Sequence, residues 1–141
     1  MTTPAYAAPT VHSNSAFWRP AALAAVVAAA ATTAVAAVAH AAGVSLAIEG
    51  EQIPLAGFTQ LTLIFAAIGI LFAAALRKWS GNPRTVFVRT TIALTALSLV
   101  PDVIVNASID TKLILMLTHL VAAAIVIPTV AARLAHQVAP E

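Results

Sequence analysis

The chain has 141 residues, of which 61% are hydrophobic and 9% are charged, and its mean hydropathy is +0.97. Soluble domains carry about a quarter charged residues, so this composition excludes an ordinary water-soluble fold and indicates a membrane protein. The sequence has no cysteine, which excludes disulfides, thiol redox chemistry and thiolate metal sites. Its few Lys and Arg residues are spread over the flanks of apolar stretches, so the basic charge balance does not indicate a nucleic-acid surface.

The N-terminal part of the chain combines a polar segment with an apolar stretch. Residues 1–16 are small, polar and interrupted by proline, and we expect them to form a disordered cytoplasmic tail. Residues 20–42 predict the first membrane span, because Pro20 suits the start of a helix and Gly43 suits its end. About 22 residues at 1.5 Å each give roughly 33 Å, enough to cross the hydrocarbon core. Most of this span is alanine, which predicts close packing of helices.

Three further apolar stretches follow, and each is long enough to cross a bilayer. They predict spans at about residues 55–76, 85–105 and 112–134. The segment RKWSGNPR between the second and third spans predicts a tight basic loop. The gap that holds Glu49 and Glu51 predicts a solvated exterior loop.

Together these stretches predict one fold for the whole chain. We expect an all-α, four-helix transmembrane bundle over residues 17–136, with neighbouring helices antiparallel because the gaps are short. Residues 137–141 are expected to form a short C-terminal tail.

The basic residues fall at the ends of alternate spans. Six of the seven Lys and Arg residues lie on one predicted side of the membrane, and Lys112 alone lies on the other. The positive-inside rule then predicts a multi-pass protein of the inner (plasma) membrane, with both termini in the cytoplasm. Tryptophan and arginine neighbours predict interfacial anchors on the basic side. These anchors are Trp18, Arg19, Arg77, Trp79 and Arg84.

A second interpretation of the first span remains open. Ala39-His40-Ala41 has the A-x-A form of a signal-peptidase site after an apolar stretch. Cleavage there would leave three spans and place the new N-terminus outside. The stretch is longer than the usual apolar region of about 7–15 residues, and a single Arg precedes it, so we favour an uncleaved span.

The third span carries a row of polar residues along one helical face. Polar side chains are costly in lipid, so we expect this face to point into the bundle. The row consists of Thr91, Thr95, Ser98, Asp102 and Asn106.

Asp102 and His119 form the pair that we single out at membrane depth, near the outer side. The favoured interpretation is an imidazole–carboxylate bond that joins the third and fourth spans. The alternative is a proton-handling or cation-binding pair that faces an outward vestibule. The full candidate polar or ion site is Asp102, His119, His40, Asn106 and Ser98.

His40 adds a second imidazole, and His40, Asp102 and His119 together form a weak candidate for a divalent metal site. The favoured interpretation of these three residues is structural, and we expect neither a metal nor a cofactor.

The sequence lacks the motifs of common enzyme classes. We find no G-x-S-x-G turn, no P-loop and no HExxH motif, so we do not expect an enzyme. The favoured function is a non-enzymatic accessory or interaction protein, whose small-residue faces pack against itself or a membrane-protein partner within the lipid bilayer. The alternative is a small transporter or channel-like protein that uses Asp102 and His119. No nucleic-acid partner is expected.

The second half of the chain resembles a known family. The segments LTALSLVPDVIVN and MLTHLVAAAIVIPTVAARLA resemble an uncharacterised four-span membrane-protein family of actinobacteria, a domain of unknown function. The clearest similarity lies at Pro101, His119, Pro128 and Arg133. The resemblance implies four spans in a bacterial inner membrane, and it implies no activity.

Overall fold

The computed structural model of the chain describes residues 15–135. Four helices make up most of this part: α1 (Ser15–Ala41), α2 (Leu55–Trp79), α3 (Pro83–Ile104) and α4 (Ile109–Ala135). Each is long and apolar enough to cross a membrane. The strands β1 (Ala47–Ile48) and β2 (Glu51–Gln52) form a small antiparallel hairpin between α1 and α2. The prediction of an all-α four-helix bundle with four membrane-spanning helices is therefore confirmed.

Every helix begins or ends outside its predicted span, and α1 and α2 extend at the same end of the bundle. Helix α1 begins at Ser15, so Ser15 and Ala16 are helical rather than part of a disordered tail. Pro20 consequently lies inside the helix, close enough to its start to remove only one backbone hydrogen bond. Helix α2 continues to Trp79, so the predicted basic loop is shorter than RKWSGNPR. Residues 1–14 and 136–141, which hold the rest of the predicted tails, lie outside the described residues.

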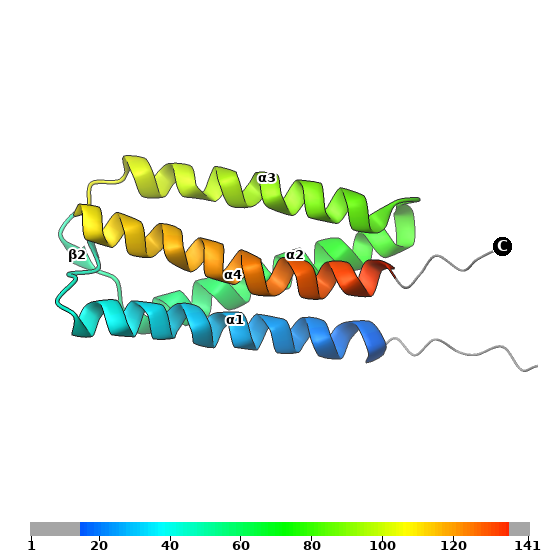
Figure 1. The fold of residues 1–141 in the computed structure, drawn as a ribbon, viewed down its shortest axis with the longest axis horizontal. Coiled ribbons are helices and arrows are strands. Elements are labelled where there is room, and N and C mark those ends of the chain that lie inside the picture. Colours follow the sequence, from blue (N-terminus) through cyan, green and yellow to red (C-terminus); the bar gives the residue numbers. More distant parts are fainter. Residues whose placement is uncertain (1–14, 136–141) are drawn as a thin grey trace, which may run out of the picture.

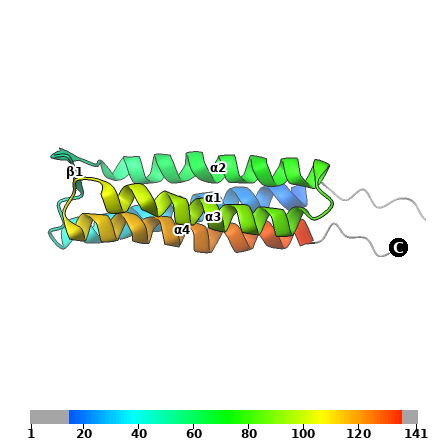
Figure 2. The ribbon, with the colours of Figure 1, turned by 90° about the horizontal axis from the view of Figure 1, so that it is seen from above.

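The helices run alternately up and down, and their contacts are unequal (Figures 1 and 2). Helix α1 packs closely against both α2 and α4, and α3 packs mainly against α4. Helices α2 and α3 contact each other much less. In Figure 1, α2 runs from beside the end of α1 to beside the start of α3. The rings of Phe72 and Phe87 meet near the α2–α3 turn, with centroids 6.3 Å apart.

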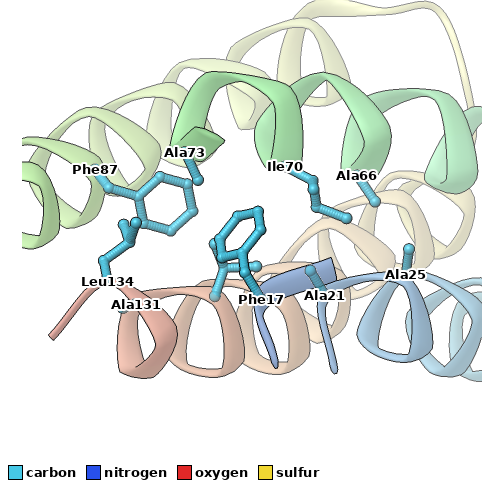
Figure 3. Close-up of a cluster of buried hydrophobic side chains, with 10 residues drawn as sticks. Phe17, Ala21, Ala25, Ala66, Ile70, Ala73, Phe87, Ala131 and Leu134 are labelled. Atoms are coloured by element: carbon cyan, nitrogen blue, oxygen red, sulfur yellow. The ribbon is translucent and has the colours of Figure 1, made fainter. Parts of the chain in front are cut away.

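The bundle has two chemically different ends, which we name here. The basic end holds the start of α1, the α2–α3 turn and the end of α4, and the hairpin end holds β1, β2 and the α3–α4 turn (Figure 1). A cluster of aromatic, aliphatic and alanine side chains fills the bundle towards the basic end (Figure 3). Its bulky members Phe17 and Phe87 are 3% and 1% exposed.

Alanine dominates the buried face of α1. Lipid tails are as apolar as leucine, so helices in a membrane associate chiefly by van der Waals packing, and small side chains let their backbones approach. This finding agrees with the close packing predicted from the alanine content. The buried residues of α1 are Phe17, Ala21, Ala24, Ala25, Ala28, Ala29, Thr32, Ala36 and Ala39.

The segment between α1 and α2 is ordered as a hairpin over a second apolar cluster. Glu49 and Gly50 both have positive φ, at 52° and 87°, as a type I′ turn requires. Leu46 also has a positive φ of 48°, and its side chain is 1% exposed in a cluster with Phe58 and Leu115. The predicted solvated loop is therefore a folded hairpin with a buried leucine, although Glu49 itself is exposed.

Candidate functional site

Asp102 and His119 contact each other across the α3–α4 interface. Nδ1 of His119 lies 3.0 Å from Oδ2 of Asp102. The sequence predicted that both residues lie at membrane depth near the outer side. They meet because α4 extends past the end of α3 at the hairpin end (Figure 1), which brings the third turn of α4 level with the last turn of α3.

The imidazole of His119 has two oxygen neighbours on the same nitrogen. Besides the carboxylate of Asp102, Nδ1 lies 2.9 Å from the carbonyl oxygen of Leu115, one turn earlier in α4. Two acceptors facing one nitrogen favour a proton on Nδ1, which leaves Nε2 as the acceptor of the neutral ring. The pair therefore has a fixed orientation and one ring nitrogen that bonds to neither oxygen.

The two members of the pair differ in exposure. The side chain of Asp102 is 10% exposed and that of His119 is 40% exposed. Oδ2 of Asp102 is shielded and has no well-aligned hydrogen bond within residues 15–135, so its attraction to His119 depends on proximity rather than ideal bond geometry. The carboxylate is thus enclosed, while the imidazole reaches the surface of the bundle.

The other predicted site residues lie apart from this pair. The hydroxyl of Ser98 donates to the Thr95 carbonyl of its own helix at 2.7 Å. Asn106 lies beyond the end of α3, and its carbonyl accepts a hydrogen bond from the Glu49 N–H at 2.9 Å. His40 is exposed and lines a cavity of about 230 Å³ at the hairpin end. Of the five candidates, the structure brings only Asp102 and His119 into direct contact.

The three-residue metal candidate is not assembled. Across residues 15–135, no three His, Asp or Glu side chains come close enough together to hold a metal ion. The cavity beside His40 is lined by Leu46, Gln52, Ile53, Pro54 and Leu55, and neither Asp102 nor His119 is among its lining residues. The structure therefore does not bring His40 together with the pair, and the weak metal candidate lacks its third ligand.

A match with a known family extends over the whole described part of the chain. Residues 12–136 match a family of unknown function, DUF6069. The chain belongs to this family. The resemblance to a domain of unknown function is thereby confirmed, and membership of DUF6069 assigns no activity. The comparisons with curated proteins and with solved structures give no match.

Hydroxyl groups join α1 to α2 in this DUF6069 chain. These contacts were not predicted from the sequence. Oγ1 of Thr32 lies 2.9 Å from Oγ1 of Thr62, and Oγ1 of Thr33 lies 2.6 Å from Oγ1 of Thr59. Thr32 and Thr33 each also donate to the carbonyl of Ala29, at 3.1 and 2.8 Å. The sequence feature that could have predicted these contacts is the Thr-Thr pair within the alanine run of the first span. Two threonines of the second span, one turn apart, lie opposite this pair.

The polar face predicted on α3 is only partly enclosed. Asp102 is buried, whereas Thr91, Thr95 and Ser98 are half-buried. The hydroxyls of Thr91 and Thr95 donate to carbonyls of their own helix, at 2.7 and 2.8 Å. These bonds satisfy the hydroxyls without a partner helix, so the row does not join α3 to its neighbours apart from Asp102.

The α3–α4 turn is fixed by its own polar contacts, which set the position of Asp102 relative to His119. Oγ of Ser108 accepts the N–H of Thr111 at 3.2 Å, so Ser108 caps α4. The ammonium group of Lys112 donates to the carbonyl of Val103 at 2.8 Å. This cation at the C-terminal end of α3 also interacts favourably with the negative end of the helix dipole.

The predicted interfacial anchors all lie at the basic end. Trp18 and Trp79 are 41% and 76% exposed. The guanidinium of Arg77 lies over the ring of Phe17, 4.4 Å from its centroid, and Nζ of Lys78 lies 5.5 Å from the ring centroid of Trp79. Arg19 and Arg84 are exposed near the same end.

Proposed function

We propose that this protein is a non-enzymatic accessory protein of the bacterial inner membrane, with both termini in the cytoplasm. It binds a second membrane protein, or a second copy of itself, through the face that α2 and α3 present to the lipid. The unequal packing of the helices supports this proposal most strongly. Nine residues of α1 are buried, whereas in α3 only Phe87 and Asp102 are buried.

The α2–α3 face has a small residue at mid-helix with free space beside it. A Cβ atom added at Gly69 would have no neighbour within 4 Å. Small residues of this kind let a second helix approach closely in a membrane. Large apolar side chains near Gly69 in the sequence of α2 are exposed, including Phe65 and Ile68 at 67% and 56%.

The polar residues of the bundle support a structural rather than a catalytic role. Asp102 contacts His119, and the threonines of α1 bond to those of α2. Enzymes need a nucleophile or acid–base group placed beside a substrate pocket. The cavity at the hairpin end contains His40 as its only titratable lining residue.

A single-cysteine experiment tests the proposed interface, because the natural chain has no cysteine. Gly69→Cys, labelled with a thiol-specific photo-crosslinker in native membranes, should give a discrete crosslinked product. Leu120→Cys on α4, which is also an exposed position, is the matched control and should give none. Equal crosslinking from both positions, or none from Gly69→Cys, would contradict the proposal.

A second variant separates loss of binding from loss of folding. Gly69→Leu places its Cβ atom in free space, and we expect the protein to unfold at the same denaturant concentration as the natural chain. The same change should block the approach of a partner helix and abolish the crosslink formed through a cysteine at the neighbouring exposed position Ile68. A Gly69→Leu protein that retains this crosslink would argue against the α2–α3 face.

The contact between Asp102 and His119 favours one alternative function, a small transporter or channel-like protein for protons or cations. His119 is partly exposed and touches an enclosed carboxylate, an arrangement that can exchange a proton. Reconstituted liposomes carrying the natural chain would then show a proton or cation flux, which Asp102→Asn and His119→Ala would each abolish. The absence of flux from the natural chain would remove this alternative.

A further inference from the structure

Arg77 is held in a defined orientation at the basic end. Its guanidinium carbon lies 4.4 Å from the centroid of the Phe17 ring, and Phe17 itself is 3% exposed. The ring of Trp18 meets that of Phe17 edge-on, with centroids 5.2 Å apart. A planar guanidinium stacked on a fixed aromatic ring keeps its edges free for hydrogen bonds.

The charge of Arg77 has no counter-ion within residues 15–135. Its Nε atom is enclosed and has no hydrogen-bond acceptor there. The ion pair found in the described part joins Asp102 to His119, far from this position. Arg77 as a whole is only half-buried, so its terminal nitrogens remain accessible. A permanent cation with five donors can therefore bind an anion from outside the described chain.

Among residues 15–135, the surroundings of Arg77 add positive charge and no negative charge. Lys78 follows it in α2, and Arg84 and Arg89 lie on the first turns of α3. The carboxylates of the described residues are Glu49, Glu51, Asp102 and Asp110, and all belong to the hairpin half of the bundle. An anion at the basic end is thus attracted by several cations and repelled by none of these carboxylates.

The anion available at this depth is the phosphate of a phospholipid. Trp18 follows Phe17 in α1, Trp79 lies two residues after Arg77 in α2, and both are exposed. Exposed tryptophans mark the headgroup level of a bilayer. Arginine binds phosphate through two parallel N–H donors. We propose that Arg77, stacked on Phe17, is a binding site for the phosphodiester of an anionic phospholipid, with Lys78 adding charge.

Lipid-dependent thermal stability of the purified full-length protein tests this site. Mixed micelles that contain phosphatidylglycerol should raise the Tm relative to micelles that contain the same fraction of phosphatidylcholine, because a ligand that binds the folded state stabilises it. Inorganic phosphate at the same concentration should leave the Tm unchanged. An equal rise with inorganic phosphate would overturn the assignment to a lipid.

Matched variants at the basic end identify the residue responsible. Arg77→Gln should lose more than half of the Tm rise caused by phosphatidylglycerol, whereas Arg84→Gln, which removes an equal but exposed charge, should keep more than half. Arg77→Lys keeps the charge and removes the planar donors, and we expect it to bind the lipid about tenfold more weakly. Equal losses from Arg77→Gln and Arg84→Gln, or natural affinity in Arg77→Lys, would overturn the proposed site.

Discussion

Helices α1 and α3 are both membrane-spanning, but they are integrated into the bundle in different ways. Helix α1 buries an alanine face between α2 and α4 and adds interhelical hydroxyl contacts at Thr32 and Thr33. Helix α3 buries only Phe87 and Asp102, and its threonines bond to its own backbone. Helix α1 is therefore packed closely between two neighbours, whereas α3 packs closely against α4 and much less against α2.

This difference separates the part of the molecule that maintains the fold from the part that is free to interact. A helix packed through alanine tolerates no added volume on its buried face. A helix that exposes most of its side chains to lipid tolerates changes there at little cost to stability. The following predictions test this distinction through free energies of unfolding, measured by denaturation in mixed micelles.

The largest effect is expected for added volume in α1. Ala28 is 0% exposed, so Ala28→Leu should force apart the helices packed against it and cost about 3 kcal/mol. Ala30→Leu, at an exposed position of the same helix, and Ala96→Leu, at an exposed position of α3, should leave the unfolding free energy nearly unchanged. Similar losses at Ala28 and Ala96 would show that the two helices do not differ as described.

The next effect concerns the main polar attachment of α3. Asp102→Ala should reduce the unfolding free energy by about 1–2 kcal/mol, because it removes the partner of His119 within the membrane. A double-mutant cycle with His119→Ala measures the coupling between the two residues. Independent, additive effects would mean that the 3.0 Å contact contributes nothing to the attachment of α3.

A smaller effect is expected from the hydroxyl contacts between α1 and α2. Thr32→Val and Thr62→Val should each cost about 0.6 kcal/mol, a typical value for polar contacts between membrane helices. The double variant should cost little more than either single change, since both remove the same contact. Thr95→Val on α3 is the control, because its hydroxyl bonds only to its own helix, and a loss there as large as at Thr32 would contradict the comparison.

The smallest effect is expected at the C-terminal end of α3. Lys112→Met removes the hydrogen bond to the Val103 carbonyl and the favourable charge at the helix end, which together contribute about 0.5 kcal/mol. High salt should reduce the difference between the natural chain and this variant, because exposed charges are screened. A salt-independent difference would assign the effect to packing of the lysine stem instead.

The sequence was sufficient for the fold because each span is a long apolar run, and a membrane admits few structures other than helices. The bounds of the spans were less accurate. The prediction ended the second span at Leu76, whereas α2 continues to Trp79. Basic and aromatic residues such as Arg77 and Trp79 are as compatible with the last turn of an interfacial helix as with a loop.

The relative placement of the site residues required the structure. The inward direction of Asp102 followed from helical periodicity, but its contact with His119 depends on how far α4 projects past α3. That projection is set at the α3–α4 turn by the Ser108 cap and Lys112, and periodicity carries no information on it. The stacking of Arg77 on Phe17 was equally inaccessible, because it depends on the early start of α1 and the late end of α2.

The hydrogen bond from the Glu49 N–H to the Asn106 carbonyl limits how far α2 and α3 can separate at the hairpin end. It ties the α1–α2 connection to the α3–α4 turn, while Phe72 and Phe87 join α2 to α3 near the opposite end. Helices α2 and α3 are therefore connected near both ends, and there is open space beside Gly69. If the proposed interface is correct, a partner helix would approach at mid-helix without any change in the connections that hold the four helices in register.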